Sequence, residues 1–320
     1  MLGKKTGGDS TVLLLDIESG SVASALIRLS LGHEPRVLAY QRQDLPMQAT
    51  RHSGDMTRSL ERALAHSLAH TSEVAARMRQ HTGIGFTGSI VGNIERAAVF
   101  LAAPWGTPNL ASGNPEYAPG MREHIQRQIQ GLFGDIPVSF FTSADSIAYS
   151  AMAVGKDEAF LVAAVRGELC ELVLLEKSGP QGYSTVPLGS GSVWRTLMSH
   201  GLLSKEEARS RLRLAHANNV PYEPLLAAAR HVNEQVALGI ELLTRAGTPQ
   251  HIMVVGEHPL GEWFAQNLAD DPHVADLFGE NGTVEALRPH HLGRRVEAGA
   301  VDDPFILLEA LFIGAQTAGR

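Results

Sequence analysis

The apolar and polar positions of the first half of the chain follow a strand pattern three times and then a helical one. Residues 12–16 form an uninterrupted apolar run that ends in a carboxylate and a small-residue turn, which predicts a buried strand entering a hairpin. Two more strands and a helix with leucines at helical spacing are predicted next: residues 22–29, 36–41 and 56–79. A strand, a helix, a strand and a small-residue helix complete this half: residues 97–102, 121–133, 138–141 and 144–154.

The same order of predicted elements begins again at Ala159. Three strand patterns are followed by a helix that begins near Val193: residues 160–165, 168–176 and 183–188. Helices at residues 205–217, 225–246 and 260–268, a strand at residues 251–255 and a final apolar helix follow. Because the architecture repeats without a repeat of sequence, we predict two α/β domains with mixed βββαβα sheets. They span residues 1–155 and 156–303, and the C-terminal helix, residues 304–320, is expected to pack back on the first.

Length, charge and composition narrow the class of protein. The 320 residues suffice for two domains of ordinary size, because single hydrophobic cores stop growing near about 250 to 300 residues. The chain is 44% hydrophobic and 19% charged, and no apolar run is long enough to span a bilayer. Its net charge of -7 disfavours nucleic acid and anionic lipid as partners. We therefore expect a cytoplasmic protein with no export signal and no direct membrane insertion.

A long loop rich in Pro, Gly, Asn and Ser, residues 104–120, separates a predicted strand from the next helix. Loops of this length are more often functional than structural filler. Trp105 and Tyr117 within it are large aromatic side chains of the kind that anchor protein partners. The alternative is that Trp105 caps the core beneath the loop. The sequence leaves both interpretations open.

Five short segments carry the functional signal: residues 13–21, 142–149, 160–172, 187–195 and 252–258. The first places Asp16 before a small-residue turn, and the last ends a strand with Gly256. In this order and spacing they resemble the phosphate turns, connecting helix and adenosine-contacting strand of the actin, Hsp70 and sugar-kinase superfamily. Within it, they are most similar to the FtsA and PilM group of bacterial cell-division and type IV pilus proteins.

The resemblance implies two ribonuclease-H-like domains, as in actin-like ATPases, and a site for ATP or ADP with Mg²⁺. In such a fold the phosphates lie between two hairpin turns whose backbone N–H groups donate to them. Asp16 matches the carboxylate that holds Mg²⁺ and is the one catalytic candidate. The positions that match the nucleotide site are Asp16, Ser19, Gly20, Ser21, Gly167, Gly189, Ser190, Gly191, Ser192 and Gly256. Ser192 is equally suited to capping the helix that follows.

The chain departs from the family's pattern where ATP chemistry takes place. Glu18 replaces a glycine of the first turn, and a carboxylate about 4 Å from a phosphate oxygen repels it by about 4 kcal/mol at an effective dielectric of about 20. Glu18 therefore opposes ATP unless its side chain turns outward or helps to bind the metal. Ala164 stands where the second turn carries an aspartate. Arg166 offers a cation to a phosphate or is an exposed turn arginine, and the second interpretation is favoured. Arg209 and Leu212 lie near the positions where the family has nucleoside-contacting residues of opposite charge.

These departures predict an actin-like scaffold of the FtsA/PilM type with a degenerate nucleotide site, which acts through protein contacts in cell division or in pilus or envelope-machine assembly. The alternative is an active ATPase or small-molecule kinase of the same superfamily. The sequence leaves enzymatic activity open but favours a protein without it. The cofactor is ATP or ADP with Mg²⁺, or none. The inserted subdomain and the C-terminal amphipathic helix of FtsA-like proteins are not evident, so self-association into filaments also stays open.

Overall fold

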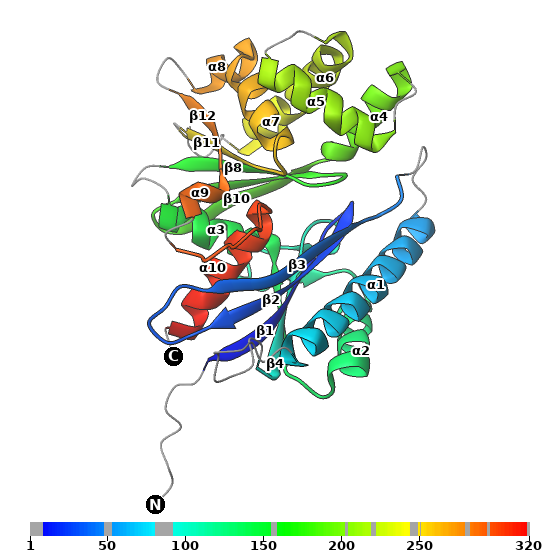
Figure 1. Ribbon diagram of the computed structural model, residues 1–320. Coiled ribbons are helices and arrows are strands. Elements are labelled where there is room, and N and C mark those ends of the chain that lie inside the picture. Colours follow the sequence, from blue (N-terminus) through cyan, green and yellow to red (C-terminus); the bar gives the residue numbers. More distant parts are fainter. Residues whose placement is uncertain are drawn as a thin grey trace, which may run out of the picture. The chain divides into compact units, whose positions relative to one another are not determined.

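The chain forms two compact units, which we call unit 1 and unit 2 (Figure 1). Unit 1 comprises Met1–Thr107, Pro115–Ser146 and Pro289–Arg320, and unit 2 comprises Pro108–Asn114 and Ile147–Arg288. The computed structural model describes residues 9–47, 53–80, 92–154, 159–201, 204–218, 222–243, 249, 251–278, 282–292 and 295–318. The expected domain limits at residues 155 and 303 lie somewhat beyond the limits of these units and remain predictions.

Unit 1 is built on a mixed sheet with the strand order β3-β2-β1-β4-β7. Its strands are β1 (Ser10–Ile17), β2 (Ser21–Leu29), β3 (Arg36–Asp44), β4 (Ile94–Leu101) and β7 (Val138–Thr142). β1, β2 and β3 are antiparallel neighbours, whereas β4 runs parallel to β1 and to β7. Asp16 is paired with Ala23 of β2 and with Phe100 of β4, so it lies at the carboxyl end of the central strand.

Helices cover both faces of this sheet, because nearly every residue of β1 and β2 is buried. The long helix α1 (Ser53–Gln80) and α2 (Met121–Phe133) lie over one face and share a core with it. α10 (Pro304–Ala318) packs against β1 and β2 on the other face (Figure 1). The apolar periodicity of α1 and the largely apolar sequence of α10 agree with these positions, since α1 has one solvent face and α10 is largely buried.

Unit 2 repeats the arrangement with the strand order β10-β9-β8-β11-β12. Its strands are β8 (Phe160–Val165), β9 (Cys170–Glu176), β10 (Gly179–Val186), β11 (His251–Val255) and β12 (Thr283–Ala286). β8, β9 and β10 are antiparallel neighbours, and β11 runs parallel to β8 and β12. The helices after the first three strands are α4 (Ser190–Gly201), α5 (Lys205–Asn218), α6 (Glu223–Leu243), α7 (Leu260–Ala269) and α8 (Pro272–Phe278).

The predicted fold class is confirmed, because each unit has three antiparallel strands followed by helices and further parallel strands. The sequence did not predict five short elements: β5 (Gly106–Thr107) and β6 (Glu116–Tyr117), which pair within the long loop, and α8, β12 and α9 (Pro289–Leu292). α3 (Ser143–Val154) agrees with its predicted range. Within the described residues, no helix combines the length and the apolarity that a membrane crossing requires.

Candidate functional site

The first of the two expected phosphate turns joins β1 to β2 and is almost completely buried. Asp16 is 0% exposed, Glu18 is 6% exposed and Ser21 is 1% exposed. The turn is closed by its own backbone, since Glu18 N–H donates to the Ser21 carbonyl at 3.1 Å and Leu45 N–H donates to the Gly20 carbonyl at 2.8 Å. The Ser21 hydroxyl donates to Glu18 Oε1 at 2.5 Å. The turn therefore brings two carboxylates together away from water.

Arg42, on the edge strand β3, supplies the positive charge for these carboxylates. Its side chain is 9% exposed, and Nη2 lies 2.7 Å from Asp16 Oδ2. Nη1 donates to the Ser21 hydroxyl at 2.5 Å and lies 3.8 Å from Glu18 Oε1. Because the guanidinium is planar and carries five donors, one arginine can contact several acceptors in fixed directions. Burial by itself would lower the pKa of Arg42, but Asp303 and Asp16 raise it well above its ordinary value.

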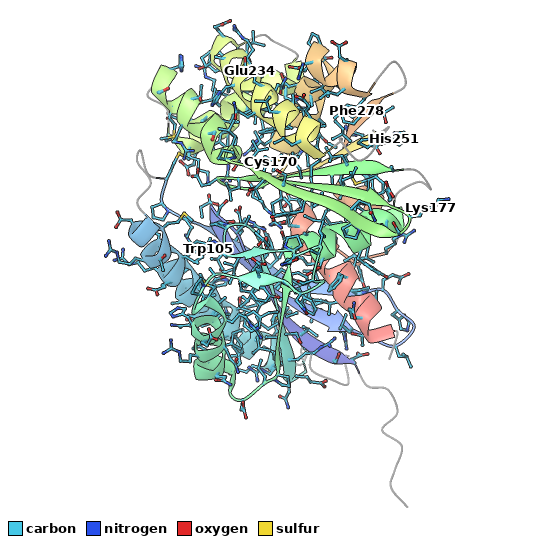
Figure 2. All side chains as sticks on the ribbon, turned by 180° about the vertical axis from the view of Figure 1, so that it is seen from behind. Trp105, Cys170, Lys177, Glu234, His251 and Phe278 are labelled. Carbon is cyan, nitrogen blue, oxygen red and sulfur yellow. The ribbon has the colours of Figure 1, made fainter. Side chains whose placement is uncertain are left out.

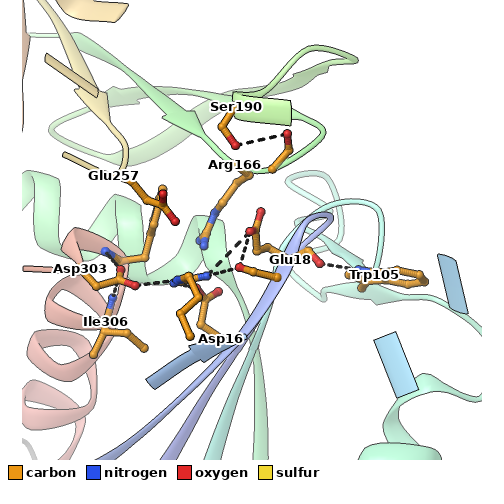
Figure 3. A network of polar contacts seen from close by, with 12 residues as sticks. Asp16, Glu18, Trp105, Arg166, Ser190, Glu257, Asp303 and Ile306 are labelled. Carbon is orange, nitrogen blue, oxygen red and sulfur yellow. Dashed lines mark hydrogen bonds and ion pairs between the residues drawn. The ribbon is translucent and has the colours of Figure 1, made fainter. Parts of the chain in front are cut away.

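Asp303, from the far end of the sequence, completes this cluster, which we call the Arg42 cluster: Asp16, Glu18, Ser21, Tyr40, Arg42 and Asp303. Arg42 Nε donates to Asp303 Oδ2 at 2.7 Å, and the Tyr40 hydroxyl donates to the same oxygen at 2.5 Å. The other oxygen accepts the backbone N–H groups of Phe305 and Ile306 at 3.0 and 3.3 Å (Figure 3). Asp303 is thus the N-cap of α10. Burial favours a raised pKa for Asp303, yet Arg42 and the hydrogen bonds from Arg42, Tyr40 and Ile306 hold this pKa below its usual value.

Trp105 lies in the core of unit 1 and not on its surface (Figure 2). It is 6% exposed, and its indole N–H donates to the Glu18 carbonyl at 3.1 Å. Trp105 therefore caps the core and does not present an exposed ring to a partner. Its apolar ring closes the core, while its one polar atom stabilises the first turn. Tyr117 is partly buried, stands edge-on to Phe140 at a ring distance of 6.2 Å, and lies under the guanidinium of Arg122.

We predict that Trp105→Phe lowers the free energy of unfolding by about 1 kcal/mol more than Trp194→Phe does, because both changes remove the same part of a buried ring and only the first loses a hydrogen bond. Urea unfolding followed by circular dichroism measures this loss. Trp194→Phe is the matched control, since no hydrogen-bond partner for its buried indole nitrogen lies within the described residues. Equal losses in the two variants would contradict the role of the Trp105 hydrogen bond.

The second expected phosphate turn, between β8 and β9, is bonded to the turn that precedes α4. Ser190 N–H donates to the Arg166 carbonyl at 2.8 Å (Figure 3). Gly191 N–H donates to the Gly167 carbonyl at 2.6 Å. A Cβ on Gly189 would lie 2.3 Å from the Arg166 carbonyl oxygen, and one on Gly191 would lie 2.9 Å from that of Gly167. These glycines therefore permit a close approach of two backbone segments. The N–H groups of Ser190 and Gly191 are directed at protein carbonyls.

Side chains around these turns are also paired within unit 2. Glu168 binds Arg195 through two parallel hydrogen bonds of 2.8 Å, a geometry that suits a carboxylate and a guanidinium. Ser192 is not the N-cap, since α4 begins two residues earlier, and its hydroxyl accepts a hydrogen bond from Arg195 at 3.3 Å. Ala164 is 0% exposed in the sheet, at the position where the resemblance would lead one to expect an aspartate.

The favoured interpretation of Arg166 as an exposed turn residue is wrong, because Arg166 is 2% exposed. Its Nε lies 3.6 Å from Glu171 Oε2, which is also buried. The Tyr183 hydroxyl donates to Glu171 Oε1 at 2.7 Å. Burial and the Glu171 carboxylate raise the pKa of Tyr183, so the tyrosine stays protonated and serves as a donor. The sequence hides this pairing because Arg166 and Glu171 come together only when the hairpin forms.

At the positions that the resemblance assigns to adenosine contact, side chains of α5 bind the turn after β11 and the start of α7. Arg209 Nη2 donates to Glu257 Oε2 at 2.9 Å, and His216 Nε2 lies 3.3 Å from Glu262 Oε2. Leu212 is 0% exposed and belongs to the core. Gly256 packs against α7, since a Cβ there would lie 3.1 Å from the Cα of Gly261. The residues at the expected nucleoside positions thus make contacts within unit 2.

Within the described ranges, no group of three or more His, Cys, Asp or Glu side chains is arranged to hold a metal ion. The sequence drew attention to two places, Asp16 and the turn at residues 189–192, as parts of a nucleotide site, and this stays a prediction. It missed Arg42, Tyr40 and Asp303, which complete the first of them. The one local signal was the Asp303-Pro304 pair before an apolar run, a common start of a helix.

Comparison with known proteins places the chain by its fold. The sequence matches no protein-family profile and no curated protein. Among solved structures, PilM in the PilM-PilN type IV pilus biogenesis complex is 14% identical, with a TM-score of 0.58, covering 96% of this chain and 98% of that one. The ethanolamine utilization protein EutJ from Carboxydothermus hydrogenoformans is 15% identical, with a TM-score of 0.55, covering 98% and 92%.

A third similar structure is an enzyme, a ROK family glucokinase from Streptomyces griseus in complex with glucose and AMPPNP. It is 12% identical, with a TM-score of 0.55, covering 96% of this chain and 100% of that one. At these identities the likeness establishes the fold and leaves function open, because one fold hosts many activities. The chain has the two-domain actin-like fold that PilM, EutJ and the ROK kinases share.

Proposed function

We propose that this chain is a cytoplasmic actin-like scaffold of the FtsA/PilM type. It acts through contacts with other proteins of a pilus or cell-division assembly, and its phosphate site is degenerate. The observation that carries the proposal is the pairing of Arg42 with Asp16 at 2.7 Å in a buried turn. In this proposal the guanidinium takes the place of the metal as the positive charge beside the first carboxylate.

The residues of the first turn do not fit Mg²⁺ with a phosphate. Mg²⁺ binds carboxylate oxygens in octahedral geometry and usually keeps several waters. Here Asp16 is 0% exposed and Glu18 is 6% exposed, so water has little access to either. A metal ion on Asp16 would also lie close to the buried guanidinium, and like charges at short distance repel strongly in a poorly solvated site. Glu18 would repel a phosphate in the same place.

The second turn supports the same proposal independently. A phosphate in this fold depends on backbone N–H groups that point at it. The N–H groups of Ser190 and Gly191 instead donate to carbonyls at 2.8 and 2.6 Å. Ala164 supplies no oxygen for a metal or for a nucleophilic water. A nucleotide would therefore have to break existing hydrogen bonds in unit 2 before it gained any.

We predict that the purified full chain binds neither Mg-ATP nor Mg-ADP with a Kd below about 1 mM, which corresponds to a binding free energy weaker than about -4 kcal/mol. Isothermal titration calorimetry and a phosphate-release assay measure binding and turnover. Asp16→Ala is compared with Asp276→Ala, a change at an exposed residue of α8. Micromolar binding with turnover that is lost only in Asp16→Ala would overturn the degenerate site and support an ATPase or kinase.

The scaffold role is tested separately by its partners. Affinity capture of the tagged full chain from cells that produce it, followed by mass spectrometry, is expected to recover proteins of one pilus or division assembly. The similarity in fold to PilM supports a partner of this kind. Recovery of the chain alone, or with metabolic enzymes only, would contradict the scaffold proposal whatever the calorimetry gives.

A further inference from the structure

The exposed face of α1 carries two histidines, His66 and His70, four residues apart. Residues four apart on an α-helix differ by about 40° around the axis and have Cβ atoms about 5 to 6 Å apart. Both imidazoles therefore leave the helix on the same side, one turn apart. Two histidines at this spacing on one helix face are a recurrent way for proteins to hold a transition metal.

The packing of α1 fixes which way this face points. Ser67 and Leu68 are 0% exposed and Thr71 is 4% exposed, so the residues beside the two histidines are directed into unit 1. Ser24 of β2 lies 2.7 Å from the hydroxyl oxygens of both Ser67 and Thr71, which holds the helix in one rotation. His66 and His70 consequently face solvent on a helix that cannot turn about its axis without breaking buried hydrogen bonds.

Both histidines are available as ligands. Neither takes part in a hydrogen bond, an ion pair or a ring contact with the part of the chain that the structure describes. Exposed Glu73, three residues after His70, adds a negative charge on the same side, and exposed Arg62, four residues before His66, adds a positive one. The local charge is balanced, so it does not exclude a cation.

We propose that His66 and His70 form a two-histidine site for a divalent transition metal such as Zn²⁺ or Ni²⁺. Neutral imidazole nitrogen suits these ions, and water completes their coordination. The site lies on the outer side of α1 and is independent of the Arg42 cluster and of the proposed scaffold role. Bound metal would cross-link one turn of α1 to the next.

The test uses Ni²⁺ and the full chain without a polyhistidine tag, titrated by calorimetry at neutral pH. The chain has 14 histidines, so the informative quantity is the difference between variants. We expect His66→Asn and His70→Asn each to remove one Ni²⁺ site or to weaken it at least about tenfold, which is about 1.4 kcal/mol. His231→Asn, at an exposed histidine of α6 with no histidine one turn away, is expected to bind as the wild type does.

A spacing variant separates chelation from the mere number of histidines. His70→Ala with Glu73→His keeps the histidine count but sets the pair seven residues apart, about 10 Å along the helix, which is too far to share one ion. This variant is expected to bind Ni²⁺ as weakly as His70→Asn. Equal affinity in the wild type, His66→Asn and the spacing variant would overturn the proposal. Unchanged melting temperatures without metal would show that all variants are folded.

Discussion

Arg42→Met is expected to lower the free energy of unfolding by about 3 to 5 kcal/mol, because it leaves buried carboxylates without their positive charge. Arg42 donates to Asp16 at 2.7 Å, to Asp303 at 2.7 Å and to Ser21 at 2.5 Å, and methionine replaces none of these donors. The side chain is 9% exposed, so water does not substitute for it. Guanidinium chloride unfolding followed by circular dichroism measures the loss.

The matched control is Arg36→Met on the same strand. Arg36 is 51% exposed and lies 3.4 Å from Glu297, an ion pair of the solvated kind that contributes about 0 to 1 kcal/mol. A loss below about 1 kcal/mol in Arg42→Met would contradict the central role of the cluster.

The Arg42 cluster also determines how the free energy of unfolding changes with pH. The pKa of Asp303 lies below its usual value of 3.8, so its contribution to stability is present above about pH 4 and is lost as the pH falls through the folded-state pKa. In Arg42→Met the largest favourable charge is gone, and burial then favours protonated Asp303. The difference in stability between wild type and Arg42→Met should therefore be widest near neutral pH and narrow below about pH 4.

The central strands β1, β2 and β8 could be predicted from the sequence because they are continuous apolar runs, whereas the short edge strand β12 was missed. Residues 12–16, 22–29 and 160–165 fall within β1, β2 and β8, where burial on both faces removes every polar position but one or two. The short elements β5 and β6 could not be predicted, since two residues of strand carry no periodicity. Tertiary pairing, and not local propensity, makes them strands.

The candidate site was harder to predict because its partners are distant in sequence. The predicted third strand ended at residue 41, where polar residues begin, whereas β3 continues to Asp44 and points Arg42 at Asp16. The local sequence does not show whether an arginine at the end of a strand is buried or exposed to solvent. The contact between Arg42 and Asp303 closes 261 residues of chain, and only the folded sheet with α10 brings the two together.

The glycines at residues 189 and 191 illustrate how one sequence signal has two physical causes. A Gly-Ser-Gly-Ser turn before a helix is expected both where a phosphate approaches the backbone and where another backbone segment does. The second cause operates here, since the carbonyls of Arg166 and Gly167 occupy the N–H groups. Sequence alone does not separate these causes, because both require the absence of a Cβ.

Gly189→Ala is accordingly expected to lower the free energy of unfolding by about 3 kcal/mol. The added Cβ would lie 2.3 Å from the Arg166 carbonyl oxygen and 2.7 Å from that of Gly167, and both obstacles are backbone atoms that cannot rotate away. Overpacking of this kind costs about 1 to 3 kcal/mol, and each hydrogen bond lengthened by the shift costs about 1 kcal/mol more. The bonds at risk are those of 2.8 and 2.6 Å that join this turn to the β8 and β9 hairpin.

Gly131→Ala in α2 is the control, and its effect should have the opposite sign. A Cβ there meets nothing within 4 Å, and alanine is favoured over glycine within a helix by about 1 kcal/mol. In chemical unfolding, the free energy of unfolding of the wild type should therefore lie between those of the two variants. If Gly189→Ala lost less than about 0.5 kcal/mol, the two backbone segments would not be in tight contact. The N–H groups of Ser190 and Gly191 would then be available to an anion, and the case for a degenerate phosphate site in unit 2 would fail.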